Sequence, residues 1–135
     1  MHIQEKGNAR AVFVYGTLMK GQRAEAMLAE GEYVGDFRLE GFAMYHLGSY
    51  PGICPCPGET VYGEVYLVSD SIVEQLDRYE REGELYDRKA VTLLGEGRSL
   101  TAEAYVYRGS VTGCPRLRRR WQAQDTDPYS FPSGN

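Results

Sequence analysis

The chain has 135 residues, of which 42% are hydrophobic and 25% charged, and its formal net charge at pH 7 is -4. These values predict one globular domain with its own core, and the acidic balance argues against nucleic acid as a partner. No apolar run approaches the roughly 20 residues that a membrane-spanning helix needs, so no membrane partner is expected. The polar N-terminus lacks the apolar core of a signal peptide. Three cysteines, Cys54, Cys56 and Cys114, are typical of reduced thiols, because any pairing leaves one over, and a cytoplasmic protein is expected.

Short runs rich in valine, leucine, tyrosine and phenylalanine recur along the chain and predict β-strands. In chain order these runs are 11–15, 33–39, 42–47, 61–68, 89–94 and 100–107. The first is nearly all apolar, so we expect it at the centre of a sheet, buried on both faces. Residues 48–58 contain three prolines and three glycines and are predicted to form a loop.

Two segments have the apolar spacing of helices. Residues 22–29 predict a short helix after a glycine turn. Residues 69–80 predict a longer helix, in which Ser71 and Glu74 have the spacing of a capping box. Because helices do not regularly separate the strands, the predicted fold class is α+β, a small mixed β-barrel with short flanking helices.

The predicted domain spans residues 11–122. Residues 1–10 are expected to be a flexible arm. The composition turns polar toward the C-terminus, and residues 123–135 are predicted to be a disordered tail. Arginines are concentrated within 115–121, which we interpret as a solvated segment with Trp121 docked on the barrel, or alternatively as a site for an anionic partner.

The segment 15–18 (Tyr-Gly-Thr-Leu) follows the first strand and precedes the first predicted helix. At such a place several backbone N–H groups can point at one spot, and their partial positive charge attracts an anion. An ordinary connecting turn has the same local sequence pattern, so the segment alone does not decide between the two.

Glu80 is the candidate for acid–base chemistry. It lies four residues after Leu76 and seven after Val73, so it projects from the apolar stripe of the predicted helix. A carboxylate in that position has a raised pKa if it is buried, which suits a group that takes up and returns a proton. The alternative is that Glu80 lies in water at a frayed helix end. Asp77, near the same stripe, could pair with Arg88.

Other chemistries find little support. His2 and His46 belong to no cluster of ligand type and spacing, so no metal is expected. A thiol dyad of Cys54 and His46 would lack a third, orienting group. No nucleotide-binding glycine motif occurs.

Four motifs together resemble the γ-glutamylcyclotransferase-like family, especially the bacterial branch with γ-glutamylamine cyclotransferases and AIG2-like proteins. They are Tyr-Gly-Thr-Leu at 15–18, Tyr-Pro-Gly-Ile at 50–53, Leu-Asp-Arg-Tyr-Glu at 76–80 and Leu-Tyr-Asp-Arg at 85–88. The resemblance covers roughly residues 11–108. The motifs are specific as a set, whereas each alone is not. The composition around Cys54 and Cys56 departs from the pattern, which puts the leaving-group side of the pocket in doubt.

The resemblance implies a small barrel with a pocket at one end. The backbone amides of 15–18 would hold the α-carboxylate of a γ-glutamyl group, and Glu80 would be the general acid/base. The α-amine would attack its own γ-amide carbonyl, so that 5-oxoproline closes and the amine leaves without a cofactor.

The residues expected to bind the substrate are Tyr15, Gly16, Thr17, Leu18, Tyr50 and Tyr86. The backbone of the turn or a tyrosine hydroxyl would stabilise the oxyanion. The expected partner is a small-molecule γ-glutamyl substrate, and the expected state is a monomer or weak homodimer. Two alternatives stay open: a non-catalytic binding module on the same barrel, and a hydrolase that uses water in place of the internal amine.

Overall fold

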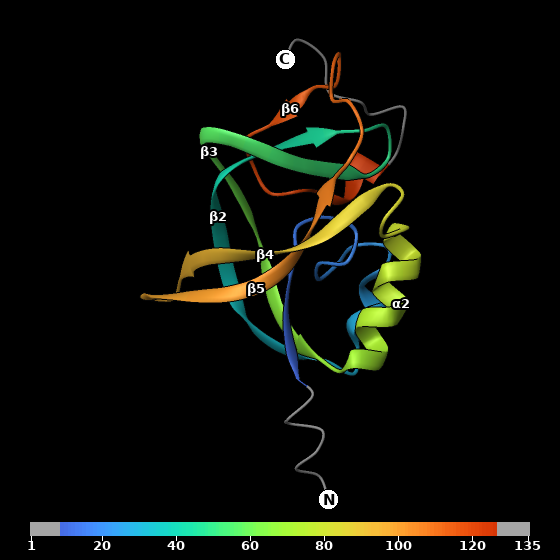
Figure 1. Ribbon diagram of the computed structural model, residues 1–135, viewed down its shortest axis with the longest axis vertical. Helices are drawn as coiled ribbons and strands as arrows, with labels where there is room; N and C mark the ends of the chain where they lie inside the picture. Colours follow the sequence, from blue (N-terminus) through green and yellow to red (C-terminus); the bar gives the residue numbers. More distant parts are fainter. Residues whose placement is uncertain (1–8, 127–135) are drawn as a thin grey trace, which may run out of the picture.

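Five strands close into a barrel in the computed structural model of the protein, which describes residues 9–126 (Figure 1). The strands are β1 Arg10–Val14, β2 Glu32–His46, β3 Pro51–Val68, β4 Tyr86–Gly95 and β5 Arg98–Tyr107. β1 pairs antiparallel with β3 and parallel with β5. The sheet continues through β4 to β2, and β2 pairs back with β3, which completes the closure. The predicted α+β fold with a mixed barrel is confirmed.

The helix α2, Asp70–Glu80, covers one side of the barrel (Figure 1). Its buried residues are Ile72, Val73 and Leu76. The Ser69 hydroxyl accepts a hydrogen bond from the Ile72 amide at 3.2 Å, so Ser69 is the N-cap. The predicted capping box at Ser71 and Glu74 is therefore wrong, because Ser71 already lies inside the helix.

Strands β2 and β3 are longer than the sequence pattern predicts. The two strands expected within 33–47 are one strand that stays paired through Gly41, where φ is 86° and the register with β3 shifts. The loop predicted over 48–58 is wrong from residue 51 onward, since β3 begins there and Pro55 pairs with β2. Its prolines lie two or four residues apart, so their ring nitrogens face one edge of the strand. The other edge of β3, opposite β2, pairs with β1 only from Glu64 onward. Over residues 51–58 this edge therefore needs no N–H donors toward β1, and prolines are tolerated there.

The helix predicted over 22–29 is also wrong in extent. The segment holds only a 3-10 helix, η1, Glu25–Leu28. Before η1 the chain makes successive turns, and the Ala24 amide donates to the Thr17 carbonyl at 2.8 Å. This hydrogen bond keeps the segment next to the turn after β1, whereas a regular helix would lead the chain away from that turn.

The C-terminal segment packs on the barrel. Strand β6, Arg116–Leu117, pairs with β2, and the Trp121 side chain is only 2% exposed, so the predicted docking of Trp121 agrees with the structure. Residues 123–126 of the predicted disordered tail form a 3-10 helix, η2, in which Asp125 is buried. At the other end, Arg10 of the predicted arm is the first residue of β1. The rest of the arm and tail, 1–8 and 127–135, lies outside the described residues.

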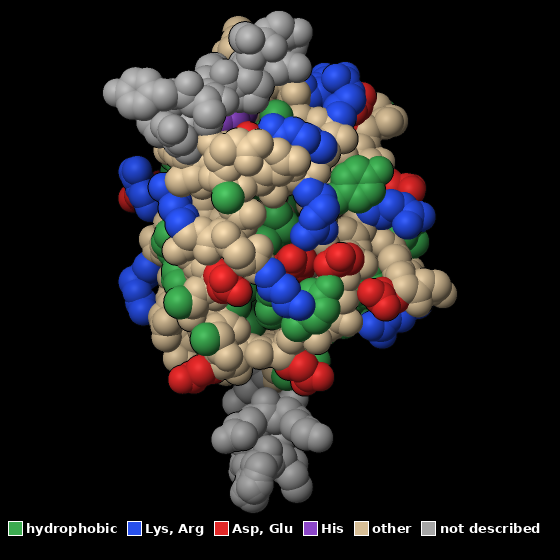
Figure 2. Space-filling view, turned by 180° about the vertical axis from the view of Figure 1, so that it is seen from behind, with side chains coloured by type: hydrophobic (Ala, Val, Ile, Leu, Met, Phe, Trp, Pro, Cys, Tyr) green, Lys and Arg blue, Asp and Glu red, His purple; other side chains and the backbone are tan. Residues whose placement is uncertain are grey.

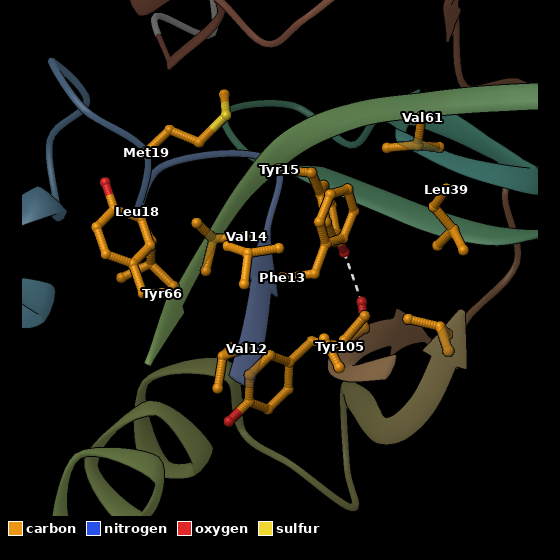
Figure 3. Close-up of a cluster of buried hydrophobic side chains, with 14 of the residues drawn as sticks. Val12, Phe13, Val14, Tyr15, Leu18, Met19, Leu39, Val61, Tyr66 and Tyr105 are labelled. Carbon is orange, nitrogen blue, oxygen red and sulfur yellow. Dashed lines mark hydrogen bonds between the residues drawn. The ribbon is translucent and has the colours of Figure 1, made fainter. Parts of the chain in front are cut away.

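The core fills the barrel and the space under α2. β1 is buried on both faces as predicted, with Val12 and Phe13 fully inaccessible. Figure 3 shows apolar side chains of β1, β2 and β3 meeting around Tyr15 and Tyr105. On the outer face drawn in Figure 2, acidic and basic side chains lie next to each other. No helix within residues 9–126 has the length and apolar character needed to cross a membrane.

Candidate active site

A cavity of about 170 Å³ lies beside the C-terminal end of β1. All seven residues that the sequence suggested for the site line it: Tyr15, Gly16, Thr17, Leu18, Tyr50, Glu80 and Tyr86. They come from the turn after β1, the start of β3, the end of α2 and the start of β4. The fold thus brings together residues that are up to 71 positions apart, which the sequence alone could only pair by motif.

Within the described part of the chain, the turn after β1 leaves three backbone amides without hydrogen-bond partners. Met19 donates to the Gly16 carbonyl at 3.1 Å, and Lys20 donates to the Glu64 carboxylate at 3.0 Å. Among residues 9–126, no hydrogen bond is formed by the amides of Gly16, Thr17 or Leu18. All three residues are buried and line the cavity, and we call their three amides the cradle. Unpaired amides grouped in a turn are a feature typical of anion-binding concavities.

Gly16 is required by a close approach and not by its backbone conformation. A Cβ atom at this position would lie 2.4 Å from Pro51 Cγ and 2.8 Å from Pro51 Cδ. The proline ring cannot rotate away, because it is closed on its own backbone. Gly16 and Pro51 therefore set the spacing between the cradle and the start of β3.

Glu80 is the last residue of α2 and half-buried against the cavity. The helix ends directly after it, because Arg81 adopts a left-handed conformation with φ of 55°. Burial raises the pKa of Glu80 to about 7, in agreement with the expectation from its place on the apolar stripe. Protonated and ionised forms are then both populated near neutral pH, as a general acid/base requires.

A second carboxylate of α2, Asp77, is held in its ionised form. Burial opposes its ionisation, but hydrogen bonds from Arg88 and Tyr105 outweigh this effect and lower the pKa of Asp77. The pairing with Arg88 that the sequence suggested is present. Because the two carboxylates lie in different surroundings, Glu80 can exchange protons near neutral pH and Asp77 stays charged.

Two tyrosine hydroxyls of the cavity lining already donate their protons to backbone carbonyls. Tyr15 donates to the Tyr105 carbonyl at 2.6 Å, the bond drawn in Figure 3, and Tyr86 donates to the Pro51 carbonyl at 2.6 Å. Burial raises the pKa of both hydroxyls. These two hydroxyls are therefore less available as oxyanion donors than the sequence suggested.

Two residues at the cavity escaped the sequence analysis. Tyr79 contacts Thr17, with 2.7 Å between the Tyr79 hydroxyl and Thr17 Oγ1, and so links α2 to the cradle. Its position directly before Glu80 in the sequence could have indicated that Tyr79 lies at the cavity. Arg23 also lines the cavity. The predicted helix over 22–29 gave Arg23 the wrong position, because η1 starts only at Glu25 and Arg23 lies in the turns before it.

Two other features prove to lie outside the cavity lining. Both ring nitrogens of His46 are hydrogen-bonded, to the Asp125 carbonyl at 2.9 Å and from the Gly48 amide at 3.2 Å, so a thiol dyad with Cys54 has no support. The arginines of the C-terminal segment are paired internally: Arg116 and Arg118 with Glu59, Arg119 with Asp125, and Arg120 with Glu64. These ion pairs favour a structural interpretation of the segment.

Comparison with known proteins places this geometry in a family. The family model described as "Gamma-glutamyl cyclotransferase, AIG2-like" matches residues 12–125. The chain belongs to this family. It is 35% identical over 103 residues to the gamma-glutamylcyclotransferase family protein YtfP of Escherichia coli K12, covering 76% of this chain and 86% of that protein. It is 32% identical over 107 residues to gamma-glutamylaminecyclotransferase A of Danio rerio, covering 71% and 66%.

Solved structures share the fold. The AIG2-like protein of mouse superposes with a TM-score of 0.73 at 24% identity, over 82% of this chain and 87% of that one. A structure described as a gamma-glutamyl cyclotransferase gives a TM-score of 0.65 at 18% identity, over 80% and 69%. The family identifies the chain as an enzyme of the gamma-glutamylcyclotransferase type.

Proposed function

We propose that the protein is a γ-glutamyl cyclotransferase that acts on a γ-glutamyl amine or peptide and releases 5-oxoproline and the free amine. The observation that carries the proposal is the half-buried Glu80, whose pKa is raised to about 7, across the same cavity as the cradle. A carboxylate of this kind suits a reaction that moves one proton between two nitrogen atoms of the substrate.

In the proposed mechanism the cradle amides of Gly16, Thr17 and Leu18 bind the α-carboxylate of the glutamyl group. The α-amine attacks the γ-carbonyl carbon and a new C–N bond closes the lactam. Glu80 accepts the proton that the attacking nitrogen loses and delivers it to the departing nitrogen as the old C–N bond breaks. The reacting atoms share one molecule, so the enzyme contributes mainly the folded conformation of the substrate and the proton transfer.

The experiment is product analysis with a panel of γ-glutamyl amines and γ-glutamyl peptides. The wild-type protein should form 5-oxoproline from at least one of them. Glu80→Gln should lower kcat by about 100-fold or more, the usual contribution of a positioned acid/base group. Glu74→Gln is the matched control, because Glu74 is an exposed residue of the same helix, and it should keep wild-type activity.

Release of glutamate without 5-oxoproline would replace this proposal with the hydrolase alternative. Binding of panel members without turnover would support the binding module. Full activity of Glu80→Gln would refute the assignment of the acid/base while leaving the reaction in place.

A further inference from the structure

We propose that Arg23 selects substrates whose leaving amine carries a carboxylate, so that γ-glutamyl amino acids and peptides are preferred over γ-glutamyl derivatives of simple amines. This selectivity rests on the proposed cyclotransferase function and assigns a substrate class to it. It also gives a role to the residue that the motifs did not single out.

Arg23 lies at the mouth of the cavity. Its side chain is exposed, whereas most of the other lining residues are buried or half-buried, including the cradle residues Gly16, Thr17 and Leu18. A substrate whose α-carboxylate reaches the buried cradle must direct its other end toward solvent. In a γ-glutamyl compound that other end is the leaving group, so the leaving group passes Arg23.

The electrostatics of the cavity favour a carboxylate at this point. Arg23 and Glu80 are the lining residues with formally charged side chains, and the other described residues of the lining are apolar side chains, tyrosines, glycine and threonine. Within residues 9–126 Arg23 belongs to no ion pair, in contrast with Arg10, Arg88 and the arginines of the C-terminal segment. Its charge is therefore available to a ligand.

The Arg23 guanidinium is also oriented. Nη2 donates to the Ser49 carbonyl at 3.3 Å, which holds the side chain toward the segment that carries Tyr50 and Pro51. A guanidinium has five N–H groups in a planar fork, so several donors remain after this bond. Two of them can bind both oxygens of a carboxylate, a geometry that a neutral amine or amide leaving group cannot offer.

The test compares two substrates that differ in one charge, γ-glutamylglycine and γ-glutamylglycinamide. The wild-type protein should prefer the acid in kcat/KM by about tenfold, the order expected for a charge-assisted contact that is partly exposed to solvent. Arg23→Gln should reduce this ratio to about one, chiefly through a higher KM for the acid, because it removes the charge and the fork. Raising the salt concentration to about 0.5 M should shrink the wild-type ratio as well.

Arg78→Gln is the matched control. Arg78 is an exposed residue of α2 outside the cavity lining, and its removal changes the net charge by the same amount. This variant should keep the wild-type ratio. Arg23→Lys should keep part of the preference, since lysine supplies the charge without the bidentate fork.

Two results would overturn the selectivity. If wild type treats both compounds alike, Arg23 does not discriminate. If Arg23→Gln loses the same factor with both, Arg23 binds a group that both share, such as the α-carboxylate. Failure of the proposed function is distinguishable, because neither compound would then yield 5-oxoproline. Calorimetric titration of the same pair into wild type and Arg23→Gln needs no turnover, and equal affinities for acid and amide would refute the role of Arg23 in that case too.

Discussion

Arg120 donates a hydrogen bond to the buried carboxylate of Glu64 at 3.0 Å, across 56 positions of sequence. The other oxygen of Glu64 accepts from the Lys20 amide at 3.0 Å and from the Tyr66 hydroxyl at 2.9 Å. Lys20 follows the cradle, so one carboxylate joins the C-terminal segment to the turn that is proposed to bind substrate. Glu64 is 4% exposed, and Arg120 is its ion-pair partner.

We expect Arg120→Met to destabilise the protein and to raise KM. It leaves a buried carboxylate without its cation, which costs about 1–3 kcal/mol here, less than a fully buried pair because Arg120 is partly exposed. Urea denaturation measures the loss. Glu64→Gln in the Arg120→Met background should recover part of it.

The control is Arg118→Met, since Arg118 pairs with Glu59 at the surface and is 65% exposed. Its unfolding free energy should change by less than about 0.5 kcal/mol. Equal effects of the two arginine variants would contradict the special role of Arg120.

The pH dependence of kcat/KM should report Glu80. Burial raises its pKa to about 7, and the ionised form is the one that accepts the proton of the attacking amine. The rate should therefore fall as the pH drops through about 7, with an apparent pKa well above the 4.5 of an ordinary glutamate. An acidic limb near 4.5 would mean that a different, unperturbed carboxylate controls the reaction.

Glu80 should also lower stability at high pH. Its pKa is higher in the folded state than in the unfolded chain, so the folded state favours the protonated form. The stabilising contribution is then complete below about pH 4.5 and is lost as the pH rises through about 7. Glu80→Gln should consequently be more stable than wild type at about pH 8, by roughly 1–2 kcal/mol because Glu80 keeps some contact with solvent, and the gain should vanish near pH 4.5. Thermal unfolding at the two pH values tests this, and a gain that does not change with pH would point to packing instead of charge.

Gly16→Ala should impair substrate binding through Pro51. The new Cβ would lie 2.4 Å from Pro51 Cγ, so the cradle and the start of β3 must move apart. We expect KM to rise by about tenfold or more, since hydrogen-bond strength falls steeply when donors are displaced. The double variant Gly16→Ala/Pro51→Ala should recover part of the affinity, because Cγ and Cδ are absent and Pro51 Cβ is 3.9 Å away, an ordinary contact. An unchanged KM in Gly16→Ala would contradict the cradle.

The sequence pattern predicted those elements in which the spacing of apolar residues matches the burial seen in the structure. The apolar run of β1, the stripe of α2 and the strands β4 and β5 are of this kind. The segment 51–58 misled because prolines usually mark loops, and only the arrangement of neighbouring strands reveals that β3 has an unpaired edge there.

The residues of the site also divide into those that the sequence can predict and those that it cannot. Glu80 is accessible to sequence reasoning, because helical spacing places it on the apolar face. Arg23 is not, since its position depends on successive turns and on a hydrogen bond to Ser49, neither of which leaves a periodic signal. The Gly16–Pro51 contact joins two motifs whose spacing in the sequence says nothing of their distance in space.

The parallel pairing of β1 with β5 has a consequence for folding. Val12 and Phe13 pair with Glu103 and Ala104, so β1 gains its second neighbour only after about 90 further residues have been synthesised. Until then one edge of the most apolar strand stays open. Pairings between positions so far apart in sequence also form slowly, because a long loop must close before they contribute. The barrel should therefore close late and cooperatively, and the exposed edge of β1 is the point at which a nascent or partly unfolded chain is most prone to aggregate.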